Sequence, residues 1–207
     1  MQIITHRGWW TTPEEKNTRV AFRRALEANY GIETDLRDMG GEIVVSHDMP
    51  IGANIMLFAE FLQLYAEIGN PTLLALNIKA DGLSHSIKSL LSRFGVTNAF
   101  VFDMAVPDAL SYTAADFMTY TRHSEYEPLP SFYELADGVW MDAFMSDWIV
   151  VESIVSHLDA GKQVALVSPE LHRRPHGDAW SDWKVLNHSH VSLCTDFPDK
   201  AEAFFKA

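Results

Sequence analysis

Residues 3–10 read IITHRGWW, a short apolar run that passes directly into a histidine, an arginine, a glycine and two tryptophans. Ile3, Ile4 and Thr5 are β-branched, and such residues favour a strand. His6 and Arg7 are poor core residues, but an imidazole can transfer protons and a guanidinium can bind phosphate. The stretch therefore predicts a buried strand with polar groups at its carboxyl end.

Seven further runs of this kind follow along the chain, separated by segments of helical period or turn composition. The eight predicted strands span residues 2–5, 31–36, 73–79, 99–103, 117–121, 138–142, 163–168 and 191–196. Apolar residues recur at helical spacing over residues 58–68, 83–94 and 150–158. Strands that alternate with helices indicate a parallel sheet, and eight in 207 residues favour a compact (β/α)8 TIM barrel. A doubly wound open sheet is the alternative.

The chain shows no internal repeat, no low-complexity tract and no linker rich in proline, glycine or serine. We therefore expect one domain over residues 1–207. Residues 169–183 contain two prolines, a glycine and several charges that interrupt any period, which predicts a long loop. Asn17 and Thr18 precede a helical pattern and are interpreted as its N-cap.

The charge and composition exclude several classes of partner. The net charge of -12 opposes binding to nucleic acid or to an anionic membrane surface. No apolar run approaches the roughly 20 residues that span a bilayer, so no integral membrane association is expected. Cys194 is the only cysteine, and the first residues do not form a secretory signal, so a cytoplasmic location is expected. The oligomeric state stays open.

Polar residues gather where the predicted strands end, and in a parallel barrel these ends form the active-site face. The residues are His6, Arg7, Glu33, Asp35, His47, Asp48, Asn77 and Lys79. His47 and Asp48 follow a short extra strand over residues 42–46, outside the eight. Trp140 and Asp142 also lie at a strand end, but nothing else in the sequence supports a role for them. His172, Arg173, Arg174 and His176 are interpreted as a solvated loop rather than as a basic lip.

Side chains alternate between the faces of a strand, so Glu33 and Asp35 point the same way. Two close carboxylates repel unless a cation lies between them, and hard oxygen ligands suit Mg²⁺ or Ca²⁺. By the same alternation, the Asn77 amide and the Lys79 ammonium share the inward face of the third strand. The pattern predicts a divalent metal site.

Two histidines beside a metal and two cations suit phosphodiester chemistry. One imidazole takes a proton from an attacking hydroxyl while the other protonates the leaving oxygen. We predict His6 and His47 as this acid/base pair, with Arg7 and Lys79 on the phosphate.

In combination and order, these motifs resemble the glycerophosphodiester phosphodiesterase family. The matching segments are HRG at 6–8, NT at 17–18, GIETD at 31–35, VVSHD at 44–48, NIK at 77–79 and CTDFPD at 194–199. The resemblance implies a TIM barrel, a divalent metal on Glu33 and Asp35, catalysis by His6 and His47, and phosphate contacts from Arg7 and Lys79. It also implies a small glycerophosphodiester substrate, cleaved by a neighbouring hydroxyl through a cyclic phosphate. Sphingomyelinase D-like enzymes resemble the same core.

Three features depart from the family pattern. Asn77 stands where the family usually has a third metal-binding glutamate, so the site has one negative charge fewer. The family's PENT appears as PEEKNT, and only eight residues separate Asp48 from Leu57, which leaves no room for an inserted subdomain. Two alternatives therefore stay open: a catalytically lapsed barrel that binds a phosphorylated ligand, and a lyase that stops at the cyclic phosphate.

Overall fold

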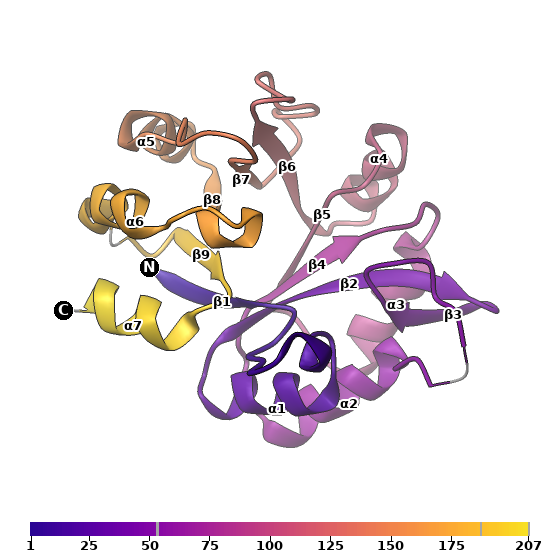
Figure 1. The fold of residues 1–207 in the computed structure, drawn as a ribbon. Coiled ribbons are helices and arrows are strands. Elements are labelled where there is room, and N and C mark those ends of the chain that lie inside the picture. The colour runs from indigo at the N-terminus through magenta and orange to yellow at the C-terminus, as the bar shows by residue number, and fades with distance from the viewer. Residues whose placement is uncertain (53, 187, 207) are drawn as a thin grey trace.

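The computed structural model describes residues 1–52, 54–186 and 188–206, and in these ranges nine strands form one sheet. The strand order is β1-β9-β8-β7-β6-β5-β4-β2-β3, and a further pairing of β1 with β2 closes eight parallel strands into a barrel (Figure 1). The (β/α)8 prediction is confirmed, and the open sheet is excluded. The strands are β1 Gln2–His6, β2 Gly31–Met39, β3 Glu42–Val45, β4 Leu74–Ile78, β5 Ala99–Phe102, β6 Met118–Ser124, β7 Gly138–Asp142, β8 Gln163–Val167 and β9 Val191–Thr195.

The remaining strand, β3, pairs with the end of β2 in the antiparallel direction, with Leu36 opposite Val45. Gly40 and Gly41 join the two strands with φ angles of 61° and 89°, a left-handed turn that glycine adopts without steric cost. This hairpin extends beyond the barrel wall and carries the chain to His47.

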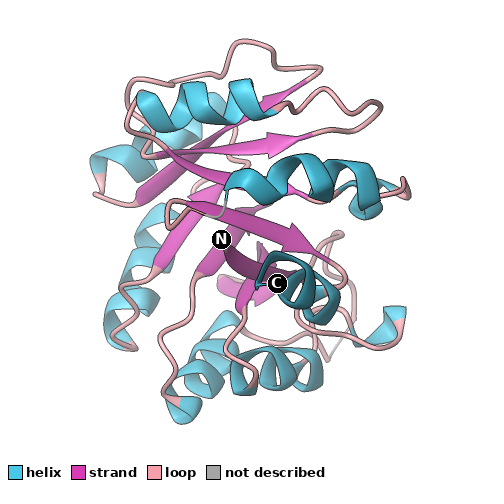
Figure 2. Cartoon of the chain, turned by 90° about the vertical axis from the view of Figure 1, so that its left-hand side faces the viewer, coloured by secondary structure: helices cyan, strands magenta, loops and turns pink. Residues whose placement is uncertain are grey.

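Helices surround the barrel (Figure 2). They are α1 Arg19–Glu27, α2 Phe58–Ile68, α3 Ser84–Arg93, α4 Val106–Ala114, α5 Val151–Asp159, α6 Gly177–Trp183 and α7 Pro198–Lys206, with 3-10 turns η1 Pro13–Glu15, η2 Pro169–His172 and η3 Lys184–Leu186. Between β6 and β7, residues 125–137 are all described and form turns instead of a helix. Within the described ranges, no helix has the length and hydropathy needed to cross a membrane.

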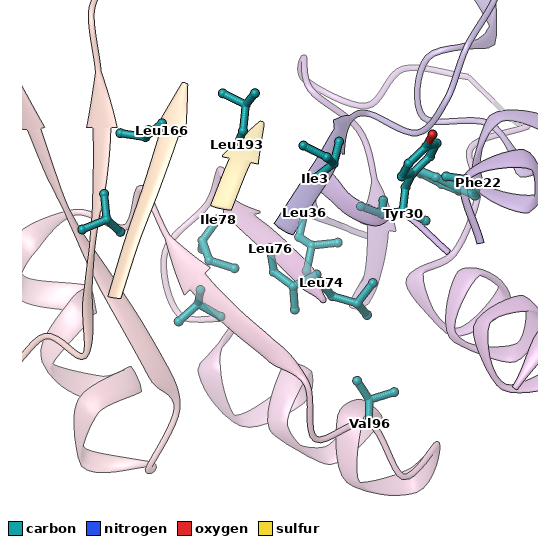
Figure 3. Packing of buried hydrophobic residues seen from close by; sticks show 14 of the residues in the cluster. Ile3, Phe22, Tyr30, Leu36, Leu74, Leu76, Ile78, Val96, Leu166 and Leu193 are labelled. Carbon is teal, nitrogen blue, oxygen red and sulfur yellow. The ribbon is translucent and has the colours of Figure 1, made fainter. Parts of the chain in front are cut away.

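The apolar side chains form two layers. One lies between the strands and the helices and includes Leu74, Leu76 and Ile78 from β4, shown in Figure 3. The other fills the barrel interior, where Phe100 stacks on Tyr120 and Phe102 on Trp140, each pair with ring centroids 3.9 Å apart. The two layers follow from the alternation of side chains along each strand.

Two local predictions need correction. Residues 169–183 contain η2 and α6 rather than only a loop, because two tryptophans pin the segment to the barrel. Trp180 and Trp183 are buried, and their indole N–H groups donate to Ser168 Oγ at 2.8 Å and to the Ile149 carbonyl at 3.1 Å. Thr18 does occupy the N-cap position of α1, but no side chain caps this helix.

We expect Gly138→Ala to destabilise the fold by about 1–3 kcal/mol, because the new methyl group overfills the barrel interior. A Cβ atom at Gly138 would lie 2.5 Å from the buried Tyr120 ring. Gly177→Ala is the matched control, because its Cβ would meet nothing within 4 Å. The measurement is the free energy of unfolding in urea, and an equal effect of the two substitutions would contradict this packing argument.

Candidate active site

Six of the eight polar residues predicted at the strand ends line a cavity of about 250 Å³, and the other two, Asp35 and Asp48, do not line it. His6, Arg7, Glu33, His47, Asn77 and Lys79 line it, together with Phe102, Asp103, Arg122, Trp140, Asp142, Phe144, Val167, Leu171 and His172. A larger groove of about 800 Å³ lies elsewhere, around Lys88, Leu91 and Phe117, but no described histidine or arginine lines it. The smaller cavity is the one with the residues for proton transfer and phosphate binding.

The HRG turn after β1 is held in an unusual backbone conformation. Arg7 and Gly8 have φ angles of 59° and 85°, and a Cβ atom on Gly8 would lie 2.9 Å from Ala21 of α1. The turn is tied to β2 because the Arg7 N–H donates to the Glu33 carbonyl at 2.9 Å. Left-handed non-glycine residues often occur at functional sites. Here the conformation sets Arg7 against the acidic pair.

Glu33 and Asp35 both point inward from β2 and are almost fully buried, at 2% and 1% exposed. Glu33 accepts hydrogen bonds from the Arg7 backbone N–H at 3.2 Å and from Asn77 Nδ2 at 3.4 Å. Burial, and then the charge of Asp35, raise the pKa of Glu33 to about 8. Ionisation of both carboxylates is therefore unfavourable here unless a further positive charge binds beside them.

Asp35 is the more strongly paired carboxylate. Its Oδ2 accepts a hydrogen bond from Asn17 Nδ2 at 2.9 Å and lies 3.1 Å from Arg7 Nε. Its Oδ1 lies 3.8 Å from Lys79 Nζ, beyond hydrogen-bond distance. Asn17 thus orients an acidic side chain of the site rather than capping α1. Asp35 therefore forms ion pairs with Arg7 and Lys79, the two side chains predicted to bind phosphate.

The oxygens in this part of the site fit a hard cation. Asn77 Oδ1 is buried and has no hydrogen-bond partner among the described residues. Together with Glu33 and Asp35, it offers the two carboxylates and one neutral oxygen that suit Mg²⁺ or Ca²⁺. Within the part of the chain that the structure describes, no group of three or more His, Cys, Asp or Glu side chains could hold a metal ion. Asn77 would therefore have to complete the ligand set.

His6 forms a dyad with Asp196, the residue that follows β9. His6 Nδ1 lies 2.7 Å from Asp196 Oδ1, and the two side chains are 15% and 12% exposed. A carboxylate can only accept, so Nδ1 carries the proton and Nε2 is left as the basic nitrogen. Burial lowers the pKa of His6, although the Asp196 hydrogen bond opposes this. His6 is therefore neutral at pH 7 and able to accept a proton.

Asp196 is itself held by Glu170 of η2. The Asp196 backbone N–H donates to Glu170 Oε1 at 3.1 Å, and the Thr195 and Ser168 hydroxyls donate to the same carboxylate. The sequence contained Asp196 within CTDFPD, but no periodicity linked it to His6, 190 positions away. Only closure of the barrel between β9 and β1 brings the two together.

His47 also lines the cavity, but its surroundings differ from those of His6. Its side chain is 43% exposed, and Nδ1 lies 2.8 Å from the carboxylate of Asp48, which is itself 93% exposed. Arg37 Nε donates to the His47 carbonyl at 3.0 Å, which ties this backbone to β2. Of the two predicted catalytic histidines, His6 is largely buried in the barrel, whereas His47 lies at the exposed edge of the cavity.

A second polar cluster lies in the same cavity. Arg122 of β6 donates a hydrogen bond to Asp103, and its Nη1 lies 3.7 Å from Asp142 Oδ2. His172 Nε2 lies 2.6 Å from Asp142 Oδ1. The fifth predicted strand, 117–121, ends before Arg122, because the apolar run stops there, whereas β6 continues to Ser124. His172, interpreted from the sequence as part of a solvated loop, is instead held on the cavity wall.

No protein-family model and no curated protein matches this chain. A provisionally assigned glycerophosphodiester phosphodiesterase from Galdieria sulphuraria aligns over 100% of this chain and 98% of its own, with 20% identity and a TM-score of 0.79. The glycerophosphodiester phosphodiesterase from Agrobacterium tumefaciens str. C58 aligns over 100% of both chains, with 16% identity and a TM-score of 0.72.

A third solved structure is an Oleispira antarctica phosphodiesterase in complex with the product sn-glycerol-3-phosphate. It covers 100% of this chain and 97% of its own, with 15% identity and a TM-score of 0.70. At such identities the likeness establishes the fold over the full length of the chain. The chemistry has to be argued from the side chains in the cavity.

Proposed function

We propose that the chain is a metal-dependent phosphodiester hydrolase of the glycerophosphodiester phosphodiesterase type. The observation that carries the proposal is one cavity lined by two histidines, Glu33 and two cations. Behind these residues, Asp196 pairs with His6, and Asp35 pairs with both cations. Two similar folds that bear this family's name support it. A phosphodiesterase of similar fold that holds sn-glycerol-3-phosphate as product supports it too. The substrate is accordingly a small glycerophosphodiester, and nucleic acid is not a partner.

In this proposal His6 and His47 are the catalytic acid/base pair. The neutral His6 takes the proton of a substrate hydroxyl next to the phosphodiester, and that oxygen forms a bond to phosphorus. The bond from phosphorus to the leaving alcohol breaks, and His47 supplies the proton that this alcohol needs. Water then opens the resulting cyclic phosphate. In this step His47 takes a proton from the attacking water, and His6 returns its proton to the substrate hydroxyl.

Arg7 and Lys79 bind the phosphate oxygens, since both cations reach the cavity and both are already positioned by Asp35. A divalent cation, Mg²⁺ or Ca²⁺, is held by Glu33, Asp35 and the amide oxygen of Asn77. The chemistry that a bound cation supplies at these oxygens is neutralisation of phosphate charge and activation of the attacking hydroxyl. The single cysteine, Cys194, is buried and free, which is compatible with the cytoplasmic location that we propose.

The test is release of alcohol from glycerophosphocholine and from an aryl phosphodiester, with Mg²⁺, with Ca²⁺ or with chelator. The native chain is compared with His6→Ala and Asn77→Glu. We expect metal-dependent cleavage by the native chain that chelator abolishes. Phosphorus NMR of the products distinguishes full hydrolysis from a lyase reaction that stops at the cyclic phosphate.

Asn77 favours one other function, a lapsed barrel that binds a phosphorylated ligand without cleaving it. An amide in place of a carboxylate removes one negative charge from the proposed ligand set. If the native chain cleaves no diester with either metal while Asn77→Glu is active, the lapsed barrel is the correct function.

The raised pKa of Glu33 predicts how a metal affects stability at different pH. In the metal-free chain, Glu33 keeps its proton up to about pH 8, whereas its ordinary pKa is 4.5. Its folded-state pKa lies above the unfolded value, so this group makes the metal-free fold progressively less stable between those pH values. Metal binding requires the ionised form and relieves that cost. Mg²⁺ or Ca²⁺ should therefore raise the Tm more at pH 8 than at pH 6.

Thermal denaturation with metal or with chelator, at both pH values, measures this difference. Glu33→Gln is the control, because it has no proton to lose and should show no pH dependence of the metal effect. Equal metal-induced shifts in Tm at the two pH values would rule out Glu33 as a ligand that binds by losing a proton.

A further inference from the structure

Arg122 and Asp142 of the second polar cluster lie across the barrel from β1 and β2 of the proposed phosphate site. In the closed order β2-β1-β9-β8-β7-β6-β5-β4, β7 lies four strands from β2 in either direction, and β6 lies four strands from β1. Asp142 therefore stands opposite Glu33, and Arg122 stands opposite His6. We call Asp103, Arg122, Asp142 and His172 the far wall of the cavity. A diester that places its phosphate against Arg7 and Lys79 must direct one of its alcohol groups toward this wall.

The charge of the far wall is negative. Arg122 is the guanidinium of the cluster, and three carboxylates surround it, from Asp103, Asp142 and Glu127. Asp103 also lies 3.6 Å from Lys79 Nζ, so it links the far wall to the phosphate side. An alcohol group that carries its own negative charge would be repelled here.

Two carboxylate oxygens of the far wall have room for a new hydrogen bond. Asp142 Oδ1 is hydrogen-bonded to His172 at 2.6 Å. Asp142 Oδ2 has Arg122 Nη1 as an ion-pair partner, but the 3.7 Å between them is too long for a hydrogen bond. Asp103 Oδ1 accepts a hydrogen bond from Arg122. Asp103 Oδ2 has Lys79 Nζ as an ion-pair partner, 3.6 Å away. Among the described residues, neither Oδ2 accepts a hydrogen bond within 3.5 Å. Both acceptors belong to side chains that are about nine-tenths buried, at 7% and 12% exposed.

We propose that the far wall binds the alcohol group of the substrate and selects alcohols that carry hydrogen-bond donors, either hydroxyl or primary ammonium groups. The inference rests on the proposed function and specifies its substrate. A donor can satisfy the Oδ2 atoms of Asp142 and Asp103, whereas a quaternary ammonium brings the same charge without any donor. A cavity of about 250 Å³ with charged walls also disfavours a long acyl chain.

Three substrates separate hydrogen bonding from charge. All three share a glycerol half and differ in the second alcohol group: glycerol with hydroxyl donors, ethanolamine with ammonium donors, and choline with the same positive charge as ethanolamine but no donor. Because a hydrogen bond to a charged group changes an equilibrium by about 10- to 100-fold, kcat/KM should favour the first two substrates over the third by at least about tenfold.

Asp142→Asn tests the assignment. His172 would keep its bond to the remaining oxygen, and the Oδ2 position would become an N–H donor that faces the donors of the substrate. We expect the ratio of kcat/KM for the donor substrates to kcat/KM for glycerophosphocholine to fall by about tenfold or more. Asp147→Asn is the matched control, because Asp147 is 64% exposed and lies outside the cavity lining. Asp103→Asn is the second variant, should Asp142→Asn not fold.

Binding is measured in parallel by calorimetry on the His6→Ala chain, with and without Asp142→Asn. Equal kcat/KM and equal Kd for ethanolamine and choline substrates in the native far wall would overturn the inference and leave the proposed hydrolase intact. A preference that persists in both Asp142→Asn and Asp103→Asn would overturn it as well. If the native chain cleaves no diester, the proposed function fails, and the ratio of Kd values alone decides whether the far wall selects donors.

Discussion

Replacing His6 with alanine should lower kcat on glycerophosphodiesters by about 10²–10⁴-fold, the usual contribution of a positioned general acid or base. His6 is the only described histidine that pairs with Asp196, and that pairing leaves its Nε2 free to accept a proton. Removing the ring removes the proton acceptor and leaves the acidic pair and both cations in place. The loss should therefore appear in kcat rather than in KM.

The assay is steady-state cleavage of glycerophosphocholine with saturating metal. His85→Ala is a suitable control, because His85 is exposed on α3 and outside the cavity. Added imidazole should restore part of the activity of His6→Ala and none to a variant that lacks a phosphate ligand. A His6→Ala chain that keeps more than about a tenth of native kcat would exclude His6 from proton transfer.

Replacing Asp35 with asparagine should lower kcat/KM by about 10²–10³-fold, because a metal site contributes several kcal/mol to the transition state. Asp35 contacts Arg7, Lys79 and Asn17, so the change removes a metal ligand and the charge that positions two phosphate ligands. It also removes one cause of the raised pKa of Glu33. Glu33 should then ionise at a lower pH.

Metal titration and kcat/KM are measured on the same preparation, and circular dichroism checks that the barrel has folded. Asp38→Asn is the matched control, since Asp38 lies on the same strand with an exposed side chain. Weakened metal binding together with weakened activity is the expected result. Unchanged metal binding in Asp35→Asn would move the proposed cation away from β2.

The barrel and half of its site could be predicted from the sequence because strand alternation is a local property. The pattern of Glu33 with Asp35, and of Asn77 with Lys79, depends only on the two-residue period of a strand. The inward direction of all four therefore followed once their strands had been found. The residues on β1 and after β3 were located by the same end-of-strand argument.

The rest of the site depends on contacts between segments far apart in the chain, which periodicity does not encode. Asp196 meets His6 only because β9 pairs with β1. Arg122 was missed because the apolar residues that mark the strand in the sequence end at residue 121. The backbone pairing of β6 continues through the polar residues up to Ser124. The helix α6 was missed because buried tryptophans, rather than local propensity, hold it in place.

The antiparallel hairpin that leads to His47 places the two proposed catalytic histidines on differently supported parts of the fold. His6 ends a barrel strand that pairs with a strand on each side, whereas β3 pairs with β2 on one side and has only a short bridge, Val44 with Leu57, on the other. If His47 donates a proton as proposed, loops of other lengths grafted into residues 49–56 should change that donation and leave His6, Arg7 and Lys79 in place. This hairpin is therefore the place to engineer tolerance of new leaving groups.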